Sequence, residues 1–101
     1  MISIHRVRGQ SMLPTFSEGD YVLCLRPLSL LPLKVGDVVV VQHPRFGRII
    51  KRIETLNDES AMWLRGDNPQ STSSETMGWL ARQALIGRVV LHIAKPVSET
   101  A

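Results

Sequence analysis

Ser11 and Lys51 are the two residues whose types could together carry out acyl transfer. A serine hydroxyl is a weak nucleophile until a neighbouring base removes its proton, and an uncharged lysine amine can be that base. Ser11 lies in the stretch Gly-Gln-Ser-Met-Leu-Pro-Thr, residues 9–15. Taken alone it is an ordinary loop serine, so the hypothesis of a nucleophile depends on the surroundings of Lys51.

Lys51 is the lone polar residue on one face of a predicted strand. Alternate residues of a strand share a face, so Lys51 is flanked there by Ile49 and Ile53. One interpretation is a lysine that packs its methylenes on the core and extends its ammonium into water. The other is a desolvated amine, whose pKa burial lowers towards the range of a general base. A lowering of about three units would cost about 4 kcal/mol, which is expected only where the neutral amine has a task.

Other catalytic arrangements fit the sequence poorly. It contains no Gly-x-Ser-x-Gly elbow and no Ser-x-x-Lys motif. His5, His43 and His92 are scattered, with no cysteine or carboxylate at metal-site spacing near them. Cys24, the only cysteine, lies in an apolar run and is predicted to be a buried core residue. We therefore predict no metal and no other cofactor.

A third polar stretch follows at residues 64–74. Its Gly-Asp-Asn-Pro sequence, residues 66–69, is a strong turn signal, and the serines and threonine after it are typical of a solvated loop. From these residues alone the stretch has no chemical role.

The elements that must position these residues are short strands rich in valine and isoleucine. The candidates are Ile2–Val7, Tyr21–Arg26, Asp37–Gln42, Arg48–Leu56, Met62–Arg65 and Ile86–Ile93. Several short strands at close spacing favour a mostly-β sandwich or coiled barrel.

Three stretches add detail to this expectation. Four consecutive valines, residues 38–41, predict a strand that is covered on both faces. Trp79–Leu85 is the best helical candidate. Arg26–Lys34 is either a loop packed on the core or an exposed apolar lip that holds an extended peptide.

Length and composition set the class of protein. A chain of 101 residues predicts one domain, here residues 1–96 with a flexible tail at 97–101. The net charge of +3 is spread along the chain and only 5% of residues are aromatic, which argues against nucleic-acid binding. The longest apolar stretch, Leu28–Leu33, is too short to span a bilayer, and the N-terminus lacks the layout of a secretory signal. We expect a soluble, cytoplasmic protein without an integral membrane anchor.

Taken in order along the chain, these stretches resemble the sequence boxes of signal peptidase I and its relatives. Residues 9–20 resemble the box of the nucleophilic serine, and residues 36–40 resemble the strand that follows. Residues 50–52 resemble the general-base box, residues 66–68 with the serine-rich stretch resemble the third box, and residues 87–89 match the closing strand. The related LexA group shares the serine and lysine but is less similar in the third box.

The resemblance covers about residues 5 to 93 and implies both a fold and roles. The fold would be a compact signal peptidase/LexA-like catalytic core of coiled antiparallel sheets with at most one or two short helices. Ser11 would be the nucleophile, and Lys51 the base that later protonates the leaving amine. Ser71 would orient the lysine, or Thr72 if the loop aligns one residue differently. The loop around the nucleophile and the oxyanion comprises Gly9, Gln10, Ser11 and Met12, and the Ser11 N–H would be a donor to the oxyanion.

Three features depart from the family pattern. Gly9 replaces a serine that supplies a second oxyanion donor in some members. Ser73 and Glu75 stand where the third box has acidic and basic residues, which would loosen the support of the site. We also expect no membrane anchor.

A short, soluble branch of the family is more similar still. The maturation peptidases of nickel-type superoxide dismutase share the compact length, the Val-Val-Val-x-His-Pro stretch at Val39–Pro44, and Gly-Asp-Asn-Pro. This resemblance implies that the partner is the nickel superoxide dismutase proprotein, whose leader would bind as an extended strand at a sheet edge. The alternatives are a soluble peptidase of another precursor, an inactive peptide-binding relative, or a LexA-like regulator fragment, which would require an upstream helix-turn-helix.

Overall fold

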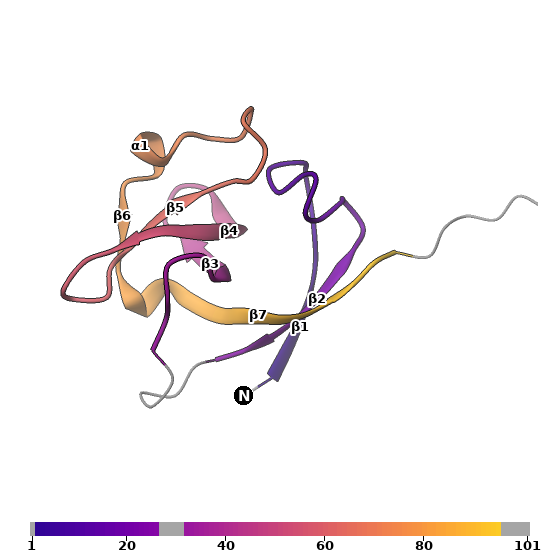
Figure 1. The fold of residues 1–101 in the computed structure, drawn as a ribbon, viewed down its shortest axis with the longest axis horizontal. Coiled ribbons are helices and arrows are strands. Elements are labelled where there is room, and N and C mark those ends of the chain that lie inside the picture. Colours follow the sequence, from indigo (N-terminus) through magenta and orange to yellow (C-terminus); the bar gives the residue numbers. More distant parts are fainter. Residues whose placement is uncertain (1, 27–31, 96–101) are drawn as a thin grey trace, which may run out of the picture.

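Seven strands make up most of the computed structural model, which describes residues 2–26 and 32–95. The strands are β1 (Ile2–Arg6), β2 (Tyr21–Leu25), β3 (Val38–His43), β4 (Gly47–Leu56), β5 (Met62–Arg65), β6 (Trp79–Leu80) and β7 (Leu85–Ile93). The helical elements are α1 (Ser74–Met77) and a 3-10 turn, η1 (Arg82–Ala84). The mostly-β fold with very little helix is therefore confirmed (Figure 1).

The strands form one antiparallel sheet in the order β1-β2-β7-β3-β4-β5-β6. β4 is the longest strand, and it changes partners along its length. Residues 47–52 pair with β3, whereas pairing with β5 begins only at Arg52. Residues 47–51 of β4 therefore have a strand neighbour on one side only, and β1 leaves one of its own edges free because it ends the sheet.

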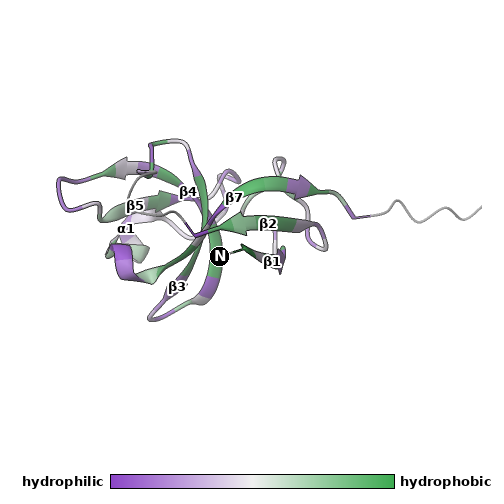
Figure 2. Cartoon of the chain, turned by 90° about the horizontal axis from the view of Figure 1, so that it is seen from below, coloured by the Kyte–Doolittle hydropathy of each residue, from purple (hydrophilic) through white to green (hydrophobic). Residues whose placement is uncertain are grey.

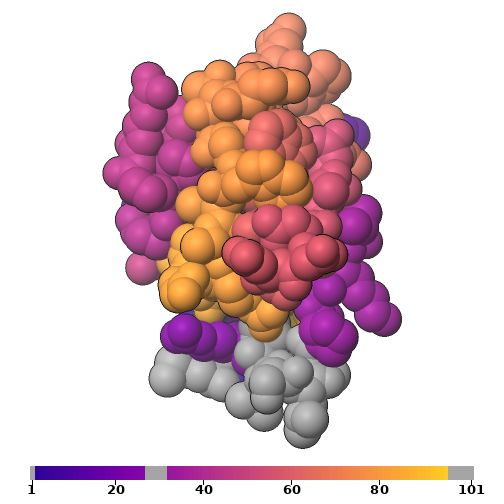
Figure 3. All heavy atoms as spheres, turned by 90° about the vertical axis from the view of Figure 1, so that its left-hand side faces the viewer, coloured from indigo at the N-terminus to yellow at the C-terminus, as the bar shows by residue number. Residues whose placement is uncertain are grey.

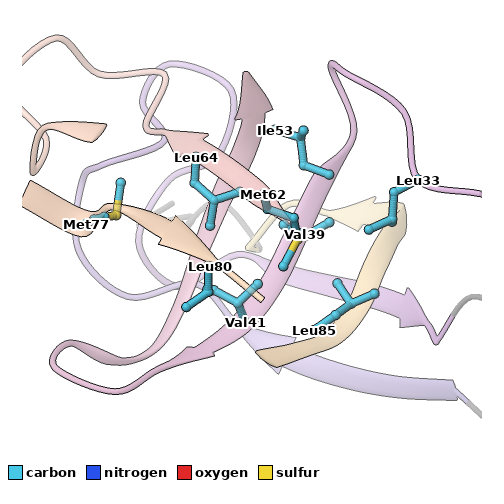
Figure 4. Packing of buried hydrophobic residues seen from close by; sticks show 9 residues of the cluster. All are labelled: Leu33, Val39, Val41, Ile53, Met62, Leu64, Met77, Leu80 and Leu85. Carbon is cyan, nitrogen blue, oxygen red and sulfur yellow. The ribbon is translucent and has the colours of Figure 1, made fainter. Parts of the chain in front are cut away.

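The valine run of β3 divides the core into two clusters, as predicted. Val39 and Val41 point into one cluster, and Val38 and Val40 point into the other, so the strand is covered on both faces. Figure 4 shows the first cluster, in which side chains of β3, β4, β5, β6 and β7 meet. Its buried members are Leu33, Val39, Val41, Ile53, Met62, Leu64, Met77, Leu80 and Leu85.

The second cluster lies under the loop that connects β1 and β2. Met12 and Phe16 of that loop are buried with Val22 and Cys24 of β2 and with Ile50 of β4. Hydrophobic residues are concentrated along the strands, while α1 and the turns are hydrophilic (Figure 2). Cys24 is fully buried, as predicted, and burial raises its pKa to about 11.

The predicted helix at Trp79–Leu85 is wrong. The segment contains β6 and η1 and ends where β7 begins, because Leu80 and Leu85 are buried in the first cluster while Trp79 pairs with Trp63 of β5. The short helix lies just before it, at α1, where Ser73 accepts a hydrogen bond from the Thr76 N–H as N-cap. In Figure 3, β6, η1 and β7 (orange to yellow) form one face of the molecule, beside the turn between β4 and β5 (pink).

The ends of the six predicted strands agree with the structure to within one residue. Of the segment Arg26–Lys34, residues 27–31 lie outside the described residues, and Leu33 is buried against the core. The predicted tail, residues 97–101, also lies outside them. Within the described residues no helix has the length and apolar character needed to cross a membrane.

Candidate active site

One pocket, of about 720 Å³, opens between the β1 edge with the chain that follows it and the half of β4 that lacks a second strand neighbour. Residues 4–11 form one wall, residues 48–51 form the other, and Thr72 and Met77 contribute to the lining. Of the residues predicted from the sequence, the pocket brings together Gly9, Gln10, Ser11, Lys51 and Thr72.

Lys51 is buried in this wall, with only 4% of its surface exposed. It lies opposite Val39 across the β3–β4 pairing, and burial lowers its pKa from the ordinary lysine value. None of the ion pairs within residues 2–26 and 32–95 involves its amine. The structure thus supports the interpretation of a desolvated lysine over that of an ammonium extended into water.

Ser11 lies on the serine loop, which we define as residues 9–15. The loop turns tightly, since the Leu13 N–H donates to the Gln10 carbonyl, and Met12 anchors it in the core with 1% exposure. Gly9 has a φ of 75°, a conformation that glycine adopts without strain. No hydrogen bond among the described residues uses the Ser11 N–H as donor or joins the Ser11 hydroxyl to Lys51.

A second segment, residues 66–71, holds the serine loop and is here called the clamp segment. The Asn68 N–H donates to the Ser11 carbonyl over 2.8 Å, and the Asn68 side-chain amide donates to the Gln10 carbonyl over 2.9 Å. In Figure 1 the loop after β5 runs beside the loop after β1. The Gly-Asp-Asn sequence is thus more than a surface turn, because it fixes the backbone on either side of the Ser11 amide.

Asp67 of the clamp segment connects the two other segments of the site. It receives two hydrogen bonds from the Arg52 guanidinium, at 2.9 and 2.8 Å, and one from the Thr15 hydroxyl. The Arg65 guanidinium is 3.2 Å away. The hydrogen bonds from Arg52, aided by Thr15, lower the pKa of Asp67 to about 2. Arg52 follows Lys51 directly in β4, so the Asp67 carboxylate links this strand to the serine loop.

Gly66 is needed for space. A methyl group at this position would collide with the Ser71 side chain and with the Ser11 carbonyl oxygen. Ser71 therefore packs against the start of the clamp segment and does not line the pocket, whereas Thr72 does. Met12, expected beside the nucleophile, is likewise turned into the core instead of the pocket.

The departures from the third box lie away from the pocket lining. Ser73 caps α1 and Glu75 is an exposed residue of its first turn. Since neither lines the pocket, their side chains do not alter its wall.

Sequence reasoning missed the role of His43. Its Nδ1 accepts the N–H groups of Arg45 and Phe46 at 3.0 and 3.2 Å, so Nε2 carries the proton and donates to the Met77 carbonyl over 3.0 Å. The ring thus links the β3–β4 turn to the end of α1 and positions Met77 and Phe46, which both line the pocket. A histidine followed by proline at the end of a valine run was the available signal.

Comparison with known proteins supports a peptidase. A family model described as Peptidase S24-like matches residues 2–90, which include every residue of the candidate site. A search of curated proteins found no match.

Proposed function

The chain belongs to the Peptidase S24-like family, and from this premise we propose that it is a serine endopeptidase in which Ser11 is the nucleophile and Lys51 the base. Serine-peptidase function follows from the family, and the observation that carries the residue assignment is the pocket. Ser11 and Lys51 line it together, and the lysine is buried with a lowered pKa and no ion-pair partner in the described part of the chain.

The proposed reaction begins with the neutral Lys51 amine. It removes the proton from the Ser11 hydroxyl, whose oxygen attacks the carbonyl carbon of the scissile peptide bond. The Ser11 N–H donates to the resulting oxyanion, an interaction worth about 3–4 kcal/mol per donor in such sites. The Lys51 ammonium then protonates the leaving amine as the C–N bond breaks, which leaves an acyl ester on Ser11. Lys51 next takes a proton from water, and the resulting hydroxide attacks the ester carbonyl. The Lys51 ammonium returns the proton to the Ser11 oxygen as the ester C–O bond breaks and the acid is released.

Thr72 is our choice for the group that orients the lysine amine. It lines the pocket, whereas the side chain of Ser71 packs against Gly66. A Thr72→Val variant that keeps full activity, beside a Ser71→Ala variant that loses it, would reverse this choice.

The substrate segment would bind in extended form along the free edge of β4. Residues 47–51 have a strand on one side only, so their other edge can accept a peptide strand through backbone hydrogen bonds. The same residues line the pocket that contains Ser11.

The substrate we propose is a precursor protein with an N-terminal leader, namely the nickel superoxide dismutase proprotein. Support comes from the sequence of residues 39–44 and from Gly-Asp-Asn-Pro. Both stretches shape the site: His43 fixes pocket residues, and Asn68 fixes the serine loop. The alternatives are processing of another precursor and an inactive peptide-binding relative. The second has less support, because its only argument was the altered third box.

The test is cleavage of a purified precursor followed by sequencing of the new N-terminus. The precursor of a nickel superoxide dismutase and a generic signal-peptide substrate are compared, with Ser11→Ala and Lys51→Ala as inactive variants whose folding is checked by circular dichroism. Processing of the second substrate but not the first rejects the dismutase assignment. A serine-reactive acylating probe that labels the wild type no better than Ser11→Ala rejects the peptidase itself.

A further inference from the structure

The charged residues that line the pocket are all basic. Arg6, Arg8 and Arg48 line it together with Lys51, and no aspartate or glutamate is among the lining residues in the described part of the chain. A basic pocket in a protein with a net charge of only +3 is a local concentration of charge.

The pocket arginines form no ion pair within the described residues, and Glu18, which lines a neighbouring pocket with Arg6 and Arg8, is the carboxylate beside them. The ion pairs within residues 2–26 and 32–95 place Asp67 with Arg52 and Arg65, and Asp37 with Arg88, while Asp20 lies 2.7 Å from His92. None of these pairs includes a pocket arginine. Arg6, Arg8 and Arg48 are all exposed, so their guanidinium groups are accessible to a ligand.

Of the three pocket arginines, Arg48 has the best position to contact a bound peptide. It lies on the half of β4 that has one strand neighbour, opposite Gln42 and three positions before Lys51. At about 3.3 Å per strand residue, it is about 10 Å from the lysine along the strand. Its charge also reaches the opposite wall, where burial and then the nearby Arg48 lower the pKa of His5 in β1.

We propose that the peptidase selects substrates with an aspartate or glutamate within about four residues of the scissile bond, and that Arg48 is the residue that recognises it. The inference rests on the proposed function of the same pocket. A guanidinium binds a carboxylate with two parallel hydrogen bonds, and an arginine is more selective for that geometry than a lysine. The apolar residues of the same pocket, such as Phe46 and Met77, suit a peptide better than a nucleic-acid backbone.

The experiment uses a degenerate peptide library, digested by the full chain and analysed by mass spectrometry. At each position around the cut, the frequency of Asp and Glu is compared with that of their neutral counterparts Asn and Gln. The wild type should enrich the acidic residues about tenfold, equivalent to about 1.4 kcal/mol, at one or two positions. High salt should reduce the enrichment, because it screens exposed charges.

Three variants separate the outcomes. Arg48→Gln should bring the acid-to-amide ratio to about one, and Arg48→Glu should favour lysine and arginine at the same position, since a carboxylate then faces the peptide. Arg26→Gln is the control, because Arg26 is exposed and does not line the pocket; it should keep the wild-type ratio.

Two results would overturn the inference while leaving the peptidase intact: cleavage with no acidic preference, or a preference that survives Arg48→Gln. Tight binding of a single-stranded oligonucleotide to Ser11→Ala, with a flat peptide profile, would assign the charge to nucleic acid instead and also overturn it. Failure of the proposed function differs from all of these, since the wild type would then neither cut the library nor react with a serine-directed probe.

Discussion

The N–H of Asn68 donates to the carbonyl oxygen of Ser11 over 2.8 Å, and this bond holds the serine loop. The same residue uses its side-chain amide to hold the Gln10 carbonyl. Two successive carbonyls are thus fixed by one residue, which sets the direction of the Ser11 N–H between them. The turn at residues 66–69 is in this way part of the site.

Asn68→Ala should reduce catalysis more than it reduces stability. The backbone bond to Ser11 persists, but the bond to Gln10 is lost, which should cost about 0.5–1.5 kcal/mol of unfolding free energy. The loosened peptide between Gln10 and Ser11 should slow acylation by about tenfold or more, as expected when an oxyanion donor is displaced. Denaturant unfolding and labelling by a serine-reactive probe measure the two effects. A variant with reduced stability and an unchanged labelling rate would show that the clamp is purely structural.

Asp67→Asn should lower the free energy of unfolding at neutral pH and make it depend less on pH in the acid range. The folded-state pKa of Asp67 is lowered to about 2, so its contribution is present above the unfolded value of about 3.9 and is lost as pH falls towards 2. Because the carboxylate remains in contact with solvent, we expect a contribution of about 1–2 kcal/mol. Unfolding free energies between pH 6 and about 2.5 test this. An equally steep acid dependence in the variant would assign the loss to other carboxylates, with Asp20 the next candidate because its pKa is also lowered to about 2.

Lys51→Met should stabilise the fold and abolish cleavage. The folded-state pKa of Lys51 is lowered by burial, so the lysine's contribution to stability is complete above the unfolded pKa of about 10.4 and is lost as pH falls through the lowered value. At neutral pH the methionine variant should therefore be more stable by about 1–3 kcal/mol, a rise in Tm of roughly 4 °C or more. The difference should shrink as pH approaches about 10. A variant that is less stable at neutral pH, as after loss of a solvated and bonded ammonium, would contradict the desolvated lysine.

Gly66→Ala should disrupt the site through one methyl group. Its Cβ would overlap the Ser11 carbonyl and the Ser71 side chain, so the clamp segment must move and the serine loop with it. We expect a loss of about 1–3 kcal/mol in stability, typical of overpacking, and nearly complete loss of activity. Gly36→Ala is the matched control, because nothing lies within 4 Å of a Cβ built there and Gly36 does not line the pocket; its positive φ costs stability but leaves the pocket in place. Retained activity in Gly66→Ala would show that the two segments can separate.

His43→Gln should destabilise the pocket wall without removing a catalytic group. The ring accepts two backbone N–H groups and donates to the Met77 carbonyl, and a glutamine cannot reach all three partners. Leaving such buried groups unpaired costs about 1–3 kcal/mol each. Thermal unfolding should show the loss, and KM should rise more than kcat falls, since the ring bonds to Phe46 and Met77, which line the pocket, and not to Ser11 or Lys51. A dominant fall in kcat would instead give His43 a role in the chemistry.

The alternation of side chains between the two faces of a strand was enough to predict which residues of β3 and β4 are buried. The four valines of β3 and the position of Lys51 between Ile49 and Ile53 follow from the two-residue period of a strand, and the structure has both as predicted. The predicted helix at Trp79–Leu85 was wrong because the apolar residues at its two ends are buried equally well by the short strand β6 and by the start of β7. The cap at Ser73 and the glycine at position 78 were the better helix signals.

The bonds of Asp67 could not be predicted in this way. Its partners Thr15 and Arg52 are distant in the sequence, and no local pattern states which loop carboxylate meets which arginine. Which of Ser71 and Thr72 lines the pocket depends on where a turn places two adjacent side chains. Both features depend on tertiary packing, which the pattern of a single sequence segment does not determine.

The clamp also determines when during synthesis the site can exist. Ser11 leaves the ribosome early, but the partners that fix its loop are Asp67 and Asn68, and the second sheet neighbour of β2 and β3 is β7, near the end of the chain. Contacts of such long range form late in folding. A chain that ends before residue 67 therefore carries the serine without the hydrogen bonds that fix its loop.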